Sequence, residues 1–223
     1  IPVAAAELVT GRMARRNAVD SVIYLARDTK NPSLFGIAGL VAVLASFMLL
    51  TFYPVISGWV LAYLGKSIMG GFSGFNADQV AAEFNNLLAN PVQMIFWQVS
   101  FLMLTGFVVA RDIRSGLEKA NLFLMPVLFL MLVMVVIYGA IEGDIGAAIS
   151  FLFTPDFSSI TPDVILSAVG HGFFSVGVGA AMLTTYGSYL DHNISIGEAA
   201  ITIGIADTII ALLAGIGIFA IVF

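Results

Sequence analysis

The sequence has no cysteine and few charged residues, and each shortage narrows the possible functions. Without cysteine the chain has no disulfide framework, no thiolate metal site and no cysteine nucleophile. Charged residues make up 10% of the chain and apolar residues 60%, whereas about a quarter of the residues of a soluble globular protein are charged. So few charges cannot cover a surface that faces water, so the composition predicts an integral membrane protein. The net charge of −5 argues against a nucleic-acid partner.

Long apolar stretches follow one another along the chain. The first residues are already apolar, with neither an initiator methionine nor the basic start of a signal peptide. We therefore expect an internal fragment of a longer membrane protein. A helix that crosses a bilayer needs about 20 mostly apolar residues. By this criterion the sequence predicts one transmembrane domain with spans at about 1–11, 34–64, 91–110, 122–141, 164–190 and 196–223.

The basic residues predict the orientation of these spans. The connections at 12–31, 111–121 and 191–195 lie on one side of the membrane, and those at 66–90 and 142–163 lie on the other. Cytoplasmic loops are enriched in lysine and arginine. The second set has only Lys66, so the first set is expected to face the cytoplasm. It carries the other basic residues, which are Arg12, Arg15, Arg16, Arg27, Lys30, Arg111, Arg114 and Lys119.

Ionisable residues are few in the predicted spans. Ionisable groups at membrane depth are costly and mark functional sites by default. Asp207 has no lysine or arginine in any span to pair with, so it either stays protonated or binds a mobile cation. Glu7, near a helix end, is more consistent with a structural hydrogen-bond anchor, and His171 is either a core residue or a functional one.

Outside the spans, residues 73–89 predict a short amphipathic helix capped near Asn76.

Four glycines fall within ten residues of one apolar span, at 170–179. Each glycine weakens a helix by about 1 kcal/mol relative to alanine, so the segment predicts an interrupted helix. Broken backbone at membrane depth persists only where protein or a water-filled cavity satisfies its polar groups. Such a break supplies carbonyl groups and helix ends for an ion and a substrate. The alternative is close helix packing through small residues, which suits Gly170 and Gly172 better than Gly177 and Gly179.

Near the middle of the first long span, Pro54 follows Tyr53. Proline removes one backbone hydrogen bond and can kink the helix. The Tyr53 hydroxyl needs a partner in apolar surroundings. This partner is either a backbone carbonyl or the carboxylate of a ligand.

The order and spacing of several motifs resemble the neurotransmitter:sodium symporter family, in its bacterial LeuT-like branch. The resemblance covers essentially the whole chain. It rests on Tyr53 with Trp59, on Gly116-Leu-Glu-Lys-Ala-Asn121 with Met125-Pro126, on Phe153-Thr-Pro-Asp-Phe157, on Phe173-Phe-Ser-Val-Gly-Val-Gly179 followed by Thr185-Tyr-Gly-Ser-Tyr189, and on Asp207 with Leu213-Ala-Gly-Ile-Gly-Ile-Phe219.

The resemblance implies an all-α integral membrane protein with part of the LeuT-like fold, in which two inverted five-helix repeats enclose a site at the midplane. The fragment would hold helices two (partial) to seven, with the broken helix near Ser175–Gly179 as the sixth. Helix one, which supplies much of the substrate and sodium shell, and helix eight would lie outside it.

The family pattern also implies residue roles. Tyr53 would contact the substrate carboxylate, and Leu49, one turn earlier, the substrate side chain. Ser175 and Asp207 would bind sodium, although many members have asparagine in place of Asp207. The implied substrate-binding set is Leu49, Tyr53, Phe174, Val176, Gly177, Gly179 and Ala180. The implied gating set is His171, Phe174, Tyr189, Gly116 and Pro126, although His171 departs from the usual glutamine.

These observations predict a sodium-coupled amino-acid symporter of the cell membrane, and a bacterial inner membrane protein in particular. It would work by alternating access, with sodium as the co-transported ion and no other cofactor. Gly177 and Ala180 are small, which favours bulky apolar substrates. An ion channel is an alternative, but no helix has the polar stripe of a pore. An intramembrane enzyme is another, but Ser175 and His171 lack the motif context of a nucleophile and its base.

Overall fold

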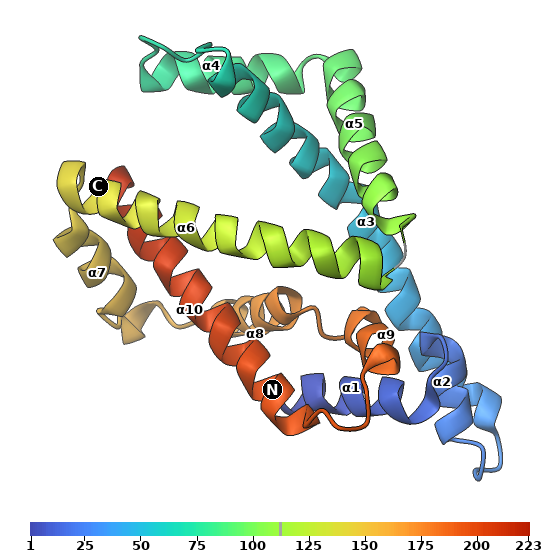
Figure 1. Ribbon diagram of the computed structural model, residues 1–223. Coiled ribbons are helices and arrows are strands. Elements are labelled where there is room, and N and C mark those ends of the chain that lie inside the picture. Colours follow the sequence, from blue (N-terminus) through green and yellow to red (C-terminus); the bar gives the residue numbers. More distant parts are fainter. Residues whose placement is uncertain (112) are drawn as a thin grey trace. The chain divides into compact units, whose positions relative to one another are not determined.

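The computed structural model describes residues 1–111 and 116–223 in full. For residues 113–115 it describes the backbone only. The side chain of Arg114, one of the basic residues assigned to the cytoplasmic side, lies outside the described part. The elements are helical throughout this part (Figure 1). They are α1 (Pro2–Ala14), α2 (Ala18–Leu25), α3 (Pro32–Ile68), α4 (Ala77–Leu88), α5 (Pro91–Val109), the π-helix η1 (Ile113–Glu118), α6 (Lys119–Glu142), α7 (Ile145–Phe153), the 3-10 helix η2 (Phe157–Ser159), α8 (Pro162–Val176), α9 (Met182–Tyr189) and α10 (Ile196–Val222).

Four helical stretches of the described chain are long and apolar enough to cross a membrane: Pro32–Ile68, Pro91–Val109, Gly116–Glu142 and Ile196–Val222. The chain divides into two compact units, which are described separately. The first holds residues 1–46 and 125–223, and the second holds residues 47–124.

Three connections contain more helix than the sequence indicated. Residues 113–121 were expected in a loop, but they form η1 and the first turn of α6. The connection at 12–31 contains α2, and the one at 142–163 contains α7. Both helices are stabilised by a local cap: the side chain of Asn17 accepts a hydrogen bond from the Asp20 amide, and that of Asp144 accepts one from the Ala147 amide. These helices have 8 and 9 residues and are too short to span a bilayer.

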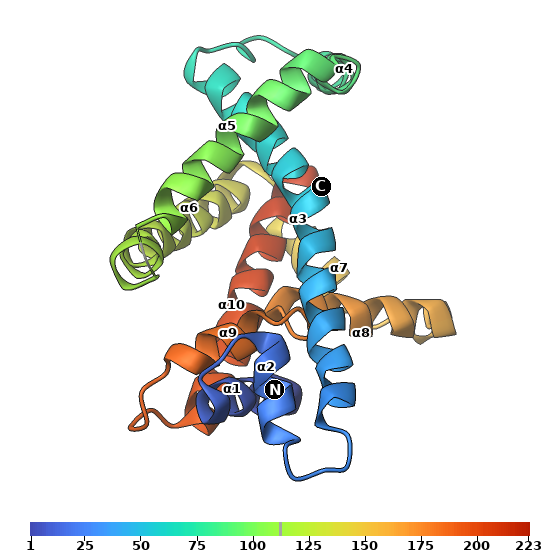
Figure 2. The same ribbon diagram turned by 90° about the vertical axis from the view of Figure 1, so that its right-hand side faces the viewer.

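In the first unit α1 lies alongside α9, and Figures 1 and 2 show the two helices side by side. Glycines permit this approach. A Cβ atom at Gly11 would overlap the carbonyl oxygen of Thr184, and one at Gly187 would lie 2.5 Å from the carbonyl oxygen of Leu8. The surrounding core is small and apolar, and it comprises Ala4, Leu8, Leu183, Ile196 and Ala200.

The second unit contains the later part of α3, with α4 and α5. The predicted amphipathic helix is present as α4, with a capping box between Asn76 and Gln79. An ion pair between Lys66 and Glu83 joins α4 to the end of α3. Gly58 of α3 approaches α5 so closely that a Cβ atom there would lie 2.8 Å from the backbone nitrogen of Gln98.

Gly11→Ala tests the close packing of α1 and α9. The added methyl group has no room against Thr184, so the helices must separate, and overpacking of this kind costs about 1–3 kcal/mol. We expect a clearly lower thermal unfolding midpoint for the detergent-purified full-length protein. The matched control is Gly197→Ala, because no atom lies within 4 Å of a Cβ at that position. Equal midpoints for Gly11→Ala and the unmodified protein would contradict the described contact.

Candidate functional site

The helix predicted at 164–190 is interrupted between α8 and α9. Helix α8 ends at Val176, and α9 begins at Met182. Three residues between them have left-handed backbone: Gly177 at φ 74°, Gly179 at φ 83° and Ala181 at φ 58°. An α-helix cannot continue through this conformation. The prediction of a broken helix is therefore confirmed, and the break, defined as residues 177–181, is the central feature of the candidate site.

Glu7 of α1 satisfies one polar group of the break. The backbone N–H of Gly179 donates a hydrogen bond to Glu7 Oε1 at 2.7 Å. A carboxylate is a strong acceptor for an amide that has left the helical pattern. The second carboxylate oxygen, Oε2, is buried and has no hydrogen-bond partner in the described part of the chain. This contact agrees with the interpretation of Glu7 as a structural anchor.

Ser46 of α3 satisfies a second group, because its hydroxyl donates to the carbonyl oxygen of Ala180. Sequence reasoning did not single out Ser46. One signal was present: a hydroxyl in the apolar run 34–64 needs an acceptor other than lipid. Local bonding to a carbonyl of the same helix would have been an equally good expectation, so the sequence alone could not identify its partner.

Ser175 and Asp207 come together beside the break. The Ser175 hydroxyl, in the last turn of α8, donates to Asp207 Oδ1 of α10 at 2.5 Å. In the described chain no lysine, arginine or histidine forms an ion pair with Asp207. No group of three His, Asp or Glu residues gathers there or elsewhere in the described residues, so the arrangement differs from a zinc-type site. The pair offers two oxygen ligands, which suit a hard cation.

The other predicted site residues occupy several elements. Val176, Gly177, Gly179 and Ala180 belong to the break or its edge, and Ala180 is buried. His171 and Phe174 lie on α8, and Tyr189 ends α9. Leu49 and Tyr53 lie one turn apart on the part of α3 that belongs to the second unit. Gly116 lies in η1 of the second unit, and Pro126 lies within α6 of the first.

Gly177 has a structural reason to be glycine. Its positive φ is the conformation that commonly ends a helix and favours glycine. The amides of Gly177 and Val178 donate to the carbonyls of Phe174 and Phe173 at 3.1 and 3.0 Å, which closes the last turn of α8. A Cβ atom at Gly177 would also lie 3.0 Å from the Met182 side chain. The backbone therefore accounts for this glycine without any need for substrate volume.

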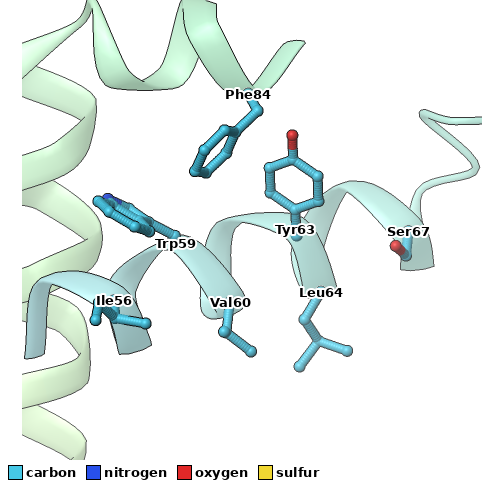
Figure 3. Close-up of a pocket in the computed structure, with 7 residues that line it drawn as sticks. All are labelled: Ile56, Trp59, Val60, Tyr63, Leu64, Ser67 and Phe84. Atoms are coloured by element: carbon cyan, nitrogen blue, oxygen red, sulfur yellow. The ribbon is translucent and has the colours of Figure 1, made fainter. Parts of the chain in front are cut away.

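The second unit contains an apolar cavity along the C-terminal part of α3, beginning three residues after Tyr53 (Figure 3). Its volume is about 440 Å³. The rings of Trp59 and Tyr63 point toward Phe84 of α4, and the Trp59 and Phe84 centroids are 5.4 Å apart. The Tyr63 hydroxyl donates to the Val80 carbonyl at 3.4 Å. The lining residues are Ile56, Trp59, Val60, Tyr63, Leu64, Ser67 and Phe84.

Comparison with known proteins identifies the family. Residues 77–223 match the model of the sodium:neurotransmitter symporter family. The chain belongs to this family. An uncharacterized sodium-dependent transporter of Bacillus subtilis (strain 168), YhdH, is 36% identical over 227 residues, which cover 100% of this chain and 48% of the relative. An uncharacterized sodium-dependent transporter of Haemophilus influenzae is 33% identical over 230 residues, covering 98% of this chain and 49% of the relative.

A solved structure supports the same assignment. The crystal structure of MhsT in complex with L-phenylalanine matches with a TM-score of 0.90 and 37% sequence identity, over 98% of this chain and 49% of MhsT. The predicted LeuT-like transporter fold is therefore confirmed, as is its multi-pass membrane character. The symporter family consists of transporters, which confirms the prediction that the chain is not an enzyme. The chain spans about half the length of the relatives it matches.

Glu7→Ala tests the anchor of the break. It leaves the Gly179 amide without its acceptor, and a hydrogen bond to a charged group contributes about 1.5–3 kcal/mol. We expect a lower thermal midpoint and strongly reduced solute uptake by the full-length protein. Glu7→Gln keeps an acceptor oxygen and should lose less of both. Glu198→Ala, on the exposed first turn of α10, controls for the loss of a carboxylate. If Glu7→Ala behaves like this control, Glu7 does not hold the break.

Proposed function

We propose that the chain is part of a sodium-coupled amino-acid symporter that works by alternating access in a bacterial cell membrane. The observation that carries the proposal is the Ser175–Asp207 pair at the end of the interrupted helix. Family membership and the sodium-dependent relatives support sodium as the coupling ion. The experiment is uptake of labelled amino acids by proteoliposomes of the full-length protein, with and without an inward sodium gradient. Uptake that ignores the gradient would refute the coupling.

The chemistry of the break explains how an ion promotes transport. The C-terminal end of α8 carries the partial negative charge of the helix dipole, and it lies at Ser175 beside the carboxylate of Asp207. A sodium ion neutralises this negative charge and accepts oxygen ligands from both side chains. Binding therefore lowers the free energy of the occupied site, and the sodium gradient drives uptake of the substrate. The remaining ligands would come from other parts of the full-length protein.

Gating is proposed for His171, Phe174 and Tyr189 near the break, and for Gly116 and Pro126 on the inward pathway. Pro126 lies inside α6 and withholds one backbone donor from that helix. The π-helix η1 precedes α6, and π-helical turns are frequent at functional sites. The structure also supports a packing role for Gly116, because a Cβ there would overlap the Val108 carbonyl of α5. Local opening of this segment would admit water to release sodium.

Asp207 leads to a prediction about anions. Its carboxylate supplies the negative charge that balances a bound sodium ion, so transport should not need chloride. We expect uptake to persist when gluconate replaces chloride. Asp207→Asn should weaken sodium affinity by about tenfold or more, since tenfold corresponds to only about 1.4 kcal/mol, and added chloride should partly restore it. Asp191→Asn, in the loop after α9, is the control for charge. A large loss of uptake in gluconate would contradict this role of Asp207.

The substrates are proposed to be bulky apolar amino acids. The structure of MhsT with L-phenylalanine supports this size class. The proposed contacts are Leu49, Tyr53, Phe174, Val176, Gly177, Gly179 and Ala180. In a competition assay with labelled leucine, unlabelled tryptophan and phenylalanine should inhibit uptake at much lower concentrations than glycine or alanine. Stronger inhibition by glycine than by leucine or tryptophan would reject the size class while leaving sodium coupling intact.

A further inference from the structure

The corner between α1 and α3 concentrates positive charge. We name the basic corner as Arg15, Arg16, Tyr24, Arg27 and Lys30. With Arg12 of α1, residues 12–30 hold five of the nine basic residues and two of the fourteen acidic residues. The segment therefore has a net charge of +3 within a chain of net charge −5.

Two arginines of the corner lie on the same ring. The guanidinium carbon of Arg16 is 4.7 Å from the centroid of Tyr24, and that of Arg27 is 4.4 Å away. Both interactions are cation–π contacts, which orient a guanidinium but do not neutralise it. The ring, which is itself half-buried on α2, thus holds two like charges close together.

The acidic residues nearby leave this charge largely unbalanced. Arg27 approaches Asp28 at 3.9 Å, but the two side chains are 58% and 93% exposed, so water and salt weaken the pair. The carboxylate of Asp20 is engaged at the start of α2, where it accepts a hydrogen bond from the Asn17 side chain at 2.7 Å. In the described chain Arg16 has no ion-pair partner.

The basic corner is fixed beside the membrane entry of α3, which begins at Pro32. Gly36 and Gly39, near the start of α3, allow α2 to pack closely against it, and Figure 2 shows α2 beside this end of α3. A Cβ at Gly36 would lie 2.8 Å from the Ile23 side chain, and one at Gly39 would lie 2.7 Å from the backbone of Val19. The Ser21 hydroxyl also donates to the Arg16 carbonyl at 3.0 Å. The arginines are therefore placed by packed backbone on the side that the basic residues assign to the cytoplasm.

We propose that Arg16 and Arg27, oriented by Tyr24, bind the phosphate of an anionic phospholipid in the cytoplasmic leaflet. A guanidinium donates paired hydrogen bonds to phosphate oxygens. Basic clusters next to a membrane helix attract anionic lipids. The ring of Tyr24 suits the boundary between headgroup and acyl chains. Leu25, which is 38% exposed beside Tyr24, adds apolar surface for the lipid.

The test measures lipid binding to the full-length protein. Delipidated protein in detergent is titrated with short-chain phosphatidylglycerol or phosphatidylcholine, and bound lipid is counted by native mass spectrometry. Phosphatidylglycerol should bind clearly more tightly, and the double variant Arg16→Gln/Arg27→Gln should lose about tenfold or more in affinity. The matched control, Arg15→Gln/Lys30→Gln, removes the same charge from residues away from the ring and should lose much less.

Each remaining outcome also decides the proposal. Equal losses of phosphatidylglycerol affinity in the two double variants would overturn the proposal, because they would show that only the total positive charge attracts the lipid. Equal binding of the two lipids by the unmodified protein would overturn it without any variant. Competition by inorganic phosphate as effective as phosphatidylglycerol would show an anion site instead of a lipid site. Tyr24→Leu removes the ring without changing charge and should also weaken binding, whereas Tyr24→Phe should retain it. Unchanged binding in Tyr24→Leu would refute the orienting role of the ring.

Discussion

The structure depends on how the chain satisfies the backbone that leaves the helical pattern between α8 and α9. Lipid offers no hydrogen bonds, so every polar group released at a break needs a partner from protein or from water. Here the partners come from distant parts of the chain: Glu7 binds the amide of Gly179, and Ser46 binds the carbonyl of Ala180. These two bonds stabilise the left-handed backbone within residues 177–181, while α8 and α9 remain helical on either side.

Close packing places the first of these partners. Glu7 can reach the break because α1 lies against α9 at a distance that only glycine permits at positions 11 and 187. Alanine and leucine residues fill the contact around them. Gly11 and Gly187 thus set the separation of α1 and α9. At this separation the carboxylate of Glu7 is close enough to accept a hydrogen bond from the Gly179 amide. On α10, Asp207 faces Ser175 at the other edge of the break.

Much of this arrangement follows from local features of the sequence. Apolar length predicts the spans, and four glycines in ten residues predict the break, because each acts through its own neighbourhood. Asn76 likewise predicts α4 through a local cap. The short helices α2 and α7 were missed because their 8 and 9 residues fall far below the length expected of a span, and η1 was missed because π-helical hydrogen bonding has no simple pattern. Ser46 and Phe84 meet partners 134 residues and 25 residues away in the chain, and hydropathy carries no information on such pairings.

Arg12 extends the role of α1 beyond the anchor at Glu7. Its guanidinium donates to the Ile194 carbonyl at 2.5 Å, in the loop that follows α9. One helix therefore holds α9 from both sides, through Gly179 before it and Ile194 after it. Helix α9 cannot shift along its axis without moving α1 or breaking one of these bonds. A displacement of the loop at 191–195 is therefore coupled to residues 177–181 through α1 as well as through α9.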